Sequence, residues 1–391
     1  MAGAWATRTL AALGAEVIRI EDPVREGRWD FVRGYPPFVD ERRGIELGVG
    51  FNACNVEKLG VTINLRDARG RALFERLVAA SDVVTENFAA GVLARLGYPY
   101  ETLERLRPGI VYVSQCGFGS EGPYASFKSW GPLVQAISGL TFLSGLPDRP
   151  SAGWGYSYMD QQGGNYMVLA VLAALVQRNR TGQGQRIEIA CAEAGASLTG
   201  PALLDADVNR RPSRRPGAPH SNREPGMAPH GIYPAAGEDR WIAIACRNDD
   251  DWRRLAAIID APWCARFATL AQREAAQDAL DEQLVDWTRA RDAQVTAHQL
   301  TSAGVPASAV ARPGERIDQD PATADWGLWP MTQHREIGTV RADGLPVHFS
   351  QTDWRIERGA ACLGQHNDDV FGRVLGMSAA EIADLRREHV I

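Results

Sequence analysis

The chain has 391 residues, and its 48 acidic side chains outnumber its 42 lysines and arginines, which leaves a formal net charge of −6. Nucleic-acid-binding proteins usually carry a basic surplus, so this balance argues against that class. The longest apolar run, residues 166–176, is too short for a membrane-spanning helix, which needs about 20 residues. The first twenty residues lack the charged-then-apolar order of a secretory signal. We therefore expect a cytoplasmic protein that binds neither nucleic acid nor membranes.

The cysteines and histidines argue against a metal centre. The six cysteines are scattered without a CxxC pair, and the seven histidines form no HxxxH or HExxH pattern. These spacings predict neither a disulfide framework nor a metal site. No GxSxG motif is present, which disfavours a serine hydrolase.

The first half of the chain alternates between predicted helices and strands. An Ala/Leu-rich helix over residues 2–13 precedes an apolar run over 15–20 that ends at Glu21. This opening resembles half of a β-α-β unit, without the strand that normally precedes the helix. Further strands are expected at 61–65, 82–84, 110–114 and 186–190, with helices at 68–80, 100–106 and 161–178. The alternation predicts a mostly parallel α/β sheet, and the apolar helix over 161–178 is expected to be buried.

The second half changes composition twice. Residues 201–229 are rich in Pro, Arg, Ser and Gly, which indicates a linker arm. Strands are then expected at 241–246 and 347–349, and helices at 251–259, 273–291, 293–303 and 379–389, with a turn-rich stretch at 312–330. We divide the chain into a large domain (1–200), the linker arm (201–229), a small domain (230–315), and a return linker with the last part of the large domain (316–391).

Asp160 directly precedes the predicted helix over 161–178 and follows an aromatic stretch. The structural interpretation is that Asp160 is the N-cap of this helix. A functional interpretation is compatible with it, because a helix N-terminus keeps a carboxylate ionised. Such a carboxylate is a competent nucleophile toward an activated acyl group.

Two further features are weak signals on their own. Glu21 at the end of its strand resembles an acid that holds a ribose, but no GxGxxG motif precedes it, so a structural role is favoured. The glycine-rich loop 117–123 could approach a ligand closely or be a plain surface turn.

Several motifs together resemble the class III CoA-transferases, the formyl-CoA:oxalate and carnitine CoA-transferase family that also includes α-methylacyl-CoA racemase. The resemblance covers nearly the whole chain in family order. The matching stretches are 2–3 with 13–21, 55–65, 86–88 with 93–97, 117–124, 135–139, 180–185 and 363–366.

The resemblance implies a Rossmann-like large domain built from both ends of the chain, with a second, smaller α/β domain in the middle. It also implies an interlocked homodimer, in which residues 201–229 and 312–330 would be the crossings between the domains.

Carried over residue by residue, the family nucleophile falls on Asp160. The implied CoA contacts fall on Ile63, Arg66, Asn87, Phe88, Arg95, Lys128 and Trp130. Cationic side chains among them suit the phosphates of CoA, and the two aromatic ones suit adenine or pantetheine.

Three departures from the family pattern limit what the resemblance implies. The first family strand and its loop have no counterpart here. The position of a basic residue on the adenine side reads Asp22-Pro23, where Arg25 or Arg28 could substitute. The glycine run of the formyl-CoA branch is replaced by residues 222–230, so oxalate is not a safe substrate assignment.

The expected activity is transfer of CoA from an acyl-CoA donor to a carboxylic acid acceptor through a covalent intermediate on Asp160, with no cofactor beyond CoA itself. One alternative is a racemase, but Trp130 occupies the position of the racemase histidine and cannot exchange a proton. Another alternative is a CoA-binding subunit of a heteromeric transferase.

Overall fold

A computed structural model describes residues 1–144, 150–210 and 222–391. The chain divides into two units. The first unit contains residues 1–140, 154–199 and 321–391, and the second contains 141–153 and 200–320. Residues 141–153, assigned to the large domain from sequence, thus group with the second unit. Part of the expected linker arm, residues 211–221, lies outside the described residues, and its beginning forms helix α9 (Gly200–Asn209).

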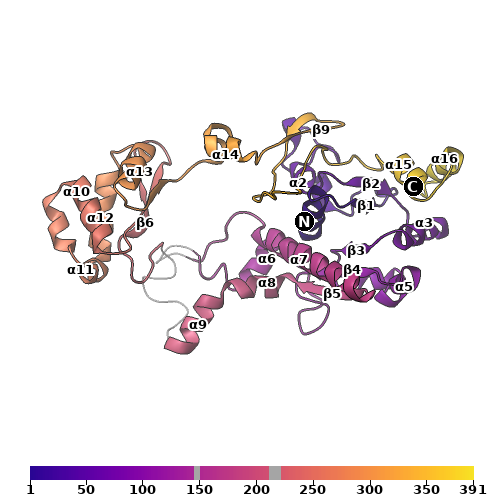
Figure 1. Ribbon diagram of the computed structural model, residues 1–391, viewed down its shortest axis with the longest axis horizontal. Helices are drawn as coiled ribbons and strands as arrows, with labels where there is room; N and C mark the ends of the chain where they lie inside the picture. Colours follow the sequence, from indigo (N-terminus) through magenta and orange to yellow (C-terminus); the bar gives the residue numbers. More distant parts are fainter. Residues whose placement is uncertain (145–149, 211–221) are drawn as a thin grey trace. The chain divides into compact units, whose positions relative to one another are not determined.

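Two separate sheets, each made of parallel strands, form the centre of the first unit (Figure 1). Strand β1 (Ile18–Glu21) pairs with β2 (Leu59–Thr62). Strands β3 (Val83–Glu86), β4 (Val111–Cys116) and β5 (Gln185–Ala190) form the second sheet in that order. The parallel pairing confirms the expected α/β architecture. The expected single sheet is wrong for the described residues, because no ladder joins β1 to β3.

Helices α1 (Ala2–Ala12), α3 (Ala68–Ala79) and α7 (Tyr158–Thr181) cover these sheets. The other elements of the first unit are η1 (Phe31–Gly34), η2 (Val39–Glu41), α2 (Val49–Cys54), α4 (Val92–Arg95), α5 (Tyr100–Leu106), α6 (Gly131–Ile137), α8 (Cys191–Leu198), α14 (Pro321–Trp326), β9 (Met331–His334), β10 (Gly338–Arg341), α15 (Asn367–Arg373) and α16 (Ala379–Arg387). The expected strand at 347–349 is not formed. A β9–β10 hairpin lies just before it in the chain.

Helix α7 differs from its prediction at its start and on its surface. It begins at Tyr158 with Ser157 as N-cap, so the N-cap role expected for Asp160 is wrong. One side of the helix packs against α1 and the sheet through Met167 and Val171. Its opposite side is exposed, with Leu169 63% accessible, so the expectation of a buried helix is wrong. The exposed apolar stripe consists of Tyr166, Leu169, Leu172 and Val176.

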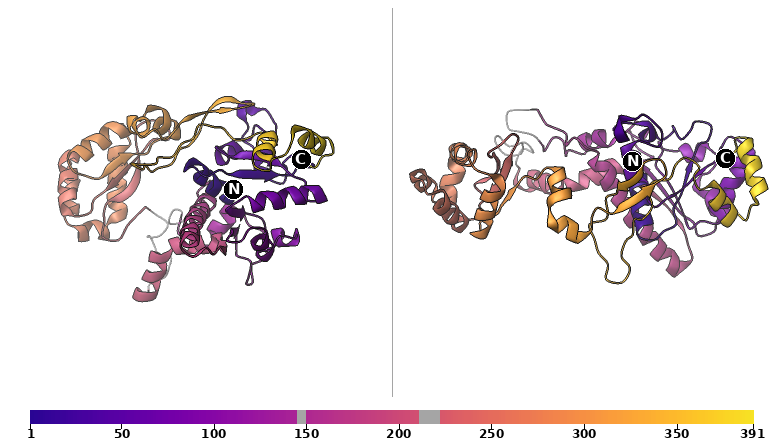
Figure 2. Two further views of the ribbon diagram at one scale, coloured as in Figure 1. Left: turned by 45° about the vertical axis from the view of Figure 1, so that its right-hand side comes forward. Right: turned by 90° about the horizontal axis from the view of Figure 1, so that it is seen from above.

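The second unit is a three-stranded antiparallel sheet with helices on one face (Figure 2). Its core contains Ile242, Ile244 and Leu255 together with buried aromatic side chains. Its elements besides α9 are β6 (His230–Pro234), β7 (Trp241–Ala245), α10 (Asp249–Ile259), η3 (Pro262–Phe267), α11 (Leu270–Ala275), α12 (Gln277–Thr288), α13 (Ala293–Ser302), β8 (Ala307–Ala309) and the π-helix η4 (Glu315–Gln319). The single helix expected over 273–291 is two helices, α11 and α12, separated at Ala276. Within the described parts of the chain, no helix is both long and apolar enough to span a membrane.

Side chains from the last part of the chain close the outer edge of β2. The Gly60 N–H donates to His366 Nδ1 (3.0 Å), and the Thr62 N–H donates to Asn367 Oδ1 (2.9 Å). The Asn367 amide also donates to Thr62 Oγ1 (2.8 Å). These two side chains therefore take the place of a neighbouring strand, since buried backbone N–H groups need acceptors.

This edge closure predicts a pH-dependent contribution of His366 to stability. Burial is the main cause that lowers the pKa of His366, with Arg358 adding to it. Below its ordinary pKa of about 6.5, the unfolded chain binds a proton that the folded chain resists, so stability falls as the pH drops. His366→Ala should cost about 1–3 kcal/mol at pH 7.5, because the Gly60 N–H loses its acceptor, and less at pH 5.5. Urea unfolding at both pH values measures the difference, and a cost that is constant or larger at pH 5.5 would contradict the prediction.

Candidate active site

Asp160 lies in the first turn of α7, where the helix dipole favours an anion. Its backbone N–H donates to the Ser157 carbonyl oxygen (3.0 Å). Its half-buried carboxylate has no hydrogen-bond or ion-pair partner among the residues that the structure describes. A carboxylate without a partner at this place is free to react with a ligand.

Gly131 at the start of α6 leaves the space that the Asp160 carboxylate occupies. A methyl group added to Gly131 would lie 2.4 Å from Asp160 Oδ2 and 3.0 Å from Ser157 Cβ. Gly131 has no positive φ angle, so its role is steric. The carboxylate position therefore depends on the absence of a side chain at residue 131.

Two consecutive glycines bring the next turn of α7 close to the sheet and to α1. A methyl group on Gly163 would lie 2.4 Å from Gln115 Nε2 and 2.7 Å from Cys191 Sγ. A methyl group on Gly164 would lie 2.8 Å from the Ala2 carbonyl oxygen. Because Gln115 and Cys191 are at the carboxyl ends of β4 and β5, these contacts place Asp160 at that edge of the sheet.

Cys191 lies near Asp160 but does not compete with it as a nucleophile. The thiol is buried and accepts a hydrogen bond from Gln115 Nε2 (3.3 Å). Burial raises the pKa of Cys191 to about 11, with a smaller contribution from the Asp160 charge. At neutral pH the side chain is therefore a protonated thiol, which is a weak nucleophile.

Hydrogen bonds fix the position of Asn87 and Phe88, the two residues that follow β3. The Asn87 side chain accepts from the Gly3 N–H (3.1 Å) and donates to the Gln115 carbonyl oxygen (2.7 Å). Buried Glu86 accepts from the Phe88 N–H (2.6 Å). Its other carboxylate oxygen accepts from the hydroxyls of Ser114 and Tyr112, and burial raises the pKa of Glu86. These contacts fix the backbone on which Asn87 and Phe88 are presented.

The predicted CoA contacts differ in how accessible they are. Phe88 is 40% and Trp130 55% exposed, and Trp130 stacks on Phe31 with ring centroids 4.8 Å apart. Ile63 is only 2% exposed, and its side chain packs in the core with residues of β2 and α3. A contact of Ile63 with CoA would therefore use its backbone, and it stays a prediction. The three predicted cations Arg66, Arg95 and Lys128 are exposed and form no ion pair among the described residues.

Glu21 has a structural partner. Its carboxylate accepts two hydrogen bonds from Arg33, from Nε (2.9 Å) and from Nη2 (2.7 Å). Arg33 is completely buried and also pairs with Glu46. The structural role favoured from the sequence is therefore the one observed.

The glycine-rich loop 117–123 is attached to β5. Ser120 donates to the Glu188 carboxylate from both its N–H and its hydroxyl. A methyl group on Gly117 would overlap with Ser129, so the loop folds back on residues just before α6. Gly117 is needed for this close approach.

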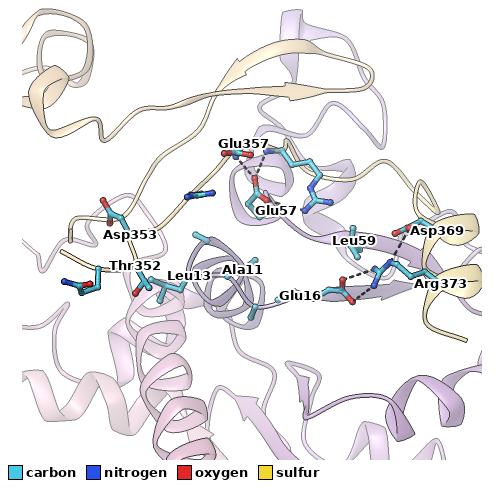
Figure 3. A pocket seen from close by; sticks show the side chains of 17 residues that line it. Ala11, Leu13, Glu16, Glu57, Leu59, Thr352, Asp353, Glu357, Asp369 and Arg373 are labelled. Atoms are coloured by element: carbon cyan, nitrogen blue, oxygen red, sulfur yellow. Dashed lines mark hydrogen bonds and ion pairs between the residues drawn. The ribbon is translucent and has the colours of Figure 1, made fainter. Parts of the chain in front are cut away.

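A cavity of about 730 Å³ lies at the amino ends of strands β1 and β2 (Figure 3). It is lined by the end of α1, the residues around the starts of β1 and β2, and residues 351–358. Its charged side chains pair with one another, as in Arg373–Glu16 (2.8 Å) and Arg358–Glu57 (3.4 Å). None of the predicted site residues lines it. In the described ranges, no three metal-ligating side chains cluster at any place.

The sequence did not reveal Gly131 and Cys191, which lie near Asp160, or Gln115, which lies beside Gly163. These residues precede or follow Asp160 by 29 to 45 positions, and no local pattern marks the contact. The pair Gly163-Gly164, one turn after Asp160 in an otherwise apolar stretch, is the signal that could have indicated close packing here.

We predict that Gly131→Ala displaces the Asp160 carboxylate without unfolding the protein. The side chain of Asp160 can rotate away from the added methyl group, so the melting temperature should change little. Turnover in the expected CoA-transfer reaction should fall at least about ten-fold, because misplacement of a reacting group by about 1 Å is costly. Gly200→Ala is the matched control, since the space around Gly200 is open. Unchanged turnover in Gly131→Ala would contradict this placement of Asp160.

Comparison with known proteins identifies the family. Residues 1–367 match the family described as CoA-transferase family III. The chain is 31% identical to succinate–glutarate CoA-transferase of Agrobacterium fabrum, over 96% of this chain and 92% of that protein. It is 34% identical to acetyl-CoA:oxalate CoA-transferase of Acetobacter aceti, over 92% of this chain and 88% of that protein. A solved CAIB/BAIF family protein from Brucella suis, 30% identical, superposes with a TM-score of 0.85 and covers 96% of both chains. The chain therefore belongs to CoA-transferase family III and is a transferase enzyme.

Proposed function

We propose that this enzyme transfers CoA from an acyl-CoA donor to a carboxylic acid acceptor, with Asp160 as the nucleophile. The observation that carries the proposal is the unpartnered Asp160 carboxylate at the start of α7, in space left by Gly131. The family match supports the reaction type. The resemblance of the sequence around Asp160 to the family motif supports the residue.

The reaction proceeds through three covalent intermediates on Asp160, two anhydrides and one thioester. Its carboxylate attacks the thioester carbonyl, the C–S bond breaks, and a mixed anhydride and CoA thiolate form. The thiolate attacks the aspartyl carbonyl of the anhydride, which breaks the bond to the bridging oxygen, gives an aspartyl-CoA thioester and releases the donor's acid as its carboxylate. The acceptor carboxylate then attacks this thioester to form a second anhydride and free thiolate. Attack of the thiolate on the acceptor acyl group yields the new acyl-CoA and restores Asp160.

Binding of CoA is assigned to the exposed residues among the predicted CoA contacts, all of which belong to the first unit with Asp160. Arg66, Arg95 and Lys128 are cations without ion-pair partners among the described residues, and each can pair with a phosphate. Phe88 and Trp130 offer exposed aromatic surface to pantetheine or adenine. Backbone N–H groups of the glycine-rich loop would stabilise the oxyanions. No further cofactor enters the proposed steps.

The substrate class is a carboxylic acid and its CoA thioester. The names of similar proteins include succinate, glutarate, D-citramalate and oxalate as acids. These relatives lie between 31% and 34% identity, so the proposal stops at the class. The racemase alternative is disfavoured because the indole of Trp130 cannot relay a proton at neutral pH.

We also propose that the enzyme is a homodimer with interlocked chains. The exposed stripe Tyr166, Leu169, Leu172 and Val176 supports this proposal. It lies on the helix that carries Asp160, and a contiguous apolar surface of this kind is typical of a subunit interface.

Asp160→Asn should abolish covalent catalysis and leave the fold intact. The amide is similar in shape to the carboxylate, which makes no hydrogen bond to the described residues that the change would break. Turnover should fall by several orders of magnitude, while the affinity for CoA changes little. Hydroxylamine added with acyl-CoA should convert Asp160 to a hydroxamate, detected by mass spectrometry of its peptide. Wild-type turnover in Asp160→Asn, or a label on another carboxylate, would contradict the mechanism.

The homodimer predicts a particle of twice 42.6 kDa in size-exclusion chromatography with light scattering at micromolar concentration. Leu169→Glu should weaken the assembly, because it places a charge in an apolar interface. Val295→Glu is a matched control, since Val295 is 68% exposed on α13 of the second unit. A wild-type monomer at this concentration would refute the assembly.

A further inference from the structure

Arg71 is an arginine of α3 whose side chain is held in place without a counter-ion. Its guanidinium lies over the Tyr98 ring, 5.2 Å from the centroid. A methyl group on Gly97 would lie 2.5 Å from Arg71 Nη2. The residue is half-buried, and no carboxylate of the described residues forms an ion pair with it.

Other arginines of the same helix have partners. Arg69 pairs with Asp67 (3.3 Å) and with Glu388, and Arg76 donates to the Leu375 carbonyl oxygen. The chain has more acidic than basic residues, so partners for Arg71 are not scarce. Arg71 instead forms a hydrogen bond with the Tyr98 hydroxyl, which also donates to Glu75, one turn further along α3.

The surroundings of Arg71 are rigid. Tyr98 is buried and donates to Glu75 Oε1 (3.2 Å). Gly97 adopts φ +98° at the end of the short helix α4, a conformation that favours glycine. A guanidinium that is partly removed from water and fixed between a ring and a glycine is preorganised for an anion.

A second unpaired cation lies on the same short helix. Arg95 donates to the Ala90 carbonyl oxygen (3.1 Å), and a methyl group on Gly91 would lie 3.0 Å from its Nη1. Arg71 therefore contacts one end of α4, and Arg95 folds back over the other end. Two guanidiniums beside one helix of four residues are suited to phosphate groups.

We infer that Arg71 binds a phosphate of CoA, an inference that rests on the proposed function. Helices α3 and α4 follow β2 and β3, whereas Asp160 lies by the carboxyl ends of β4 and β5. The thioester must reach Asp160, so the group at Arg71 is a remote part of CoA. Either the 3′-phosphate or the diphosphate fits this chemistry, and the experiment below distinguishes the two.

The test is calorimetric titration of free CoA and of 3′-dephospho-CoA into the full chain. Arg71→Gln should weaken CoA binding about ten-fold or more, since a charge-assisted pair is lost. If the 3′-phosphate is the ligand, variant and wild type will bind 3′-dephospho-CoA equally. If the diphosphate is the ligand, the loss will be the same for both compounds. Arg105→Gln is the control for net charge, because Arg105 bonds only to Thr102 in the described residues.

Equal binding of CoA by Arg71→Gln and wild type would overturn the inference and leave the proposed function untouched. Failure of the wild type to bind CoA would refute the proposed function. Arg71→Lys keeps the charge without the planar fork and should fold even if the glutamine variant does not. It should bind CoA several-fold more weakly than the wild type, and wild-type affinity in a folded lysine variant would also count against the inference.

Discussion

The geometry of the candidate site depends on three positions at which a side chain is absent. Gly131, Gly163 and Gly164 each face an atom that a methyl group would overlap. Together they let the first two turns of α7 lie against α1, α6 and the ends of β4 and β5. Since the interior is close-packed, a larger residue at Gly163 or Gly164 would shift the helix that carries Asp160, whereas one at Gly131 would displace the carboxylate itself. The position of the carboxylate is thus a result of packing along the whole start of α7.

Two buried acids organise the loops at the carboxyl ends of the strands. Glu21, the last residue of β1, is bound by Arg33, and that pair anchors the segment that carries Phe31. Glu86, the last residue of β3, holds the Phe88 N–H. Each carboxylate belongs to the last residue of its strand, and each fixes the backbone of the loop after that strand. Exposed aromatic rings at both loops are therefore presented from rigid supports.

Much of the local structure could be predicted from the sequence because it is determined locally. The strands around β4 and the helices α3 and α5 follow from short apolar patterns and lie within about two residues of their expected bounds.

Asp160 was singled out from its place before a helix. The exact start of α7 was not predictable, because its N-cap Ser157 makes no side-chain cap hydrogen bond and its neighbour Gly131 lies 26 residues earlier in the chain. Helix α7 was predicted to be buried, but one of its faces is exposed in the single chain. An apolar pattern indicates that a surface is to be buried, but it does not show whether the same chain or another chain buries it. The sequence favoured a structural role for Glu21 but could not identify its partner. That partner, Arg33, lies in an irregular segment whose course the sequence pattern does not predict.

The closure of β2 by His366 and Asn367 has a consequence for the order in which the protein folds during synthesis. The second unit, apart from residues 141–153, is one continuous stretch, residues 200–320, whose contacts can form once it has left the ribosome. The first unit is interrupted by that stretch, and its β2 edge finds its acceptors some 300 residues later in the chain. Contacts of such large sequence separation form late because loop closure is entropically costly. During translation, therefore, the outer edge of β2 lacks its acceptors until residues 366 and 367 have been made, and protection of this edge by a chaperone matters in that interval.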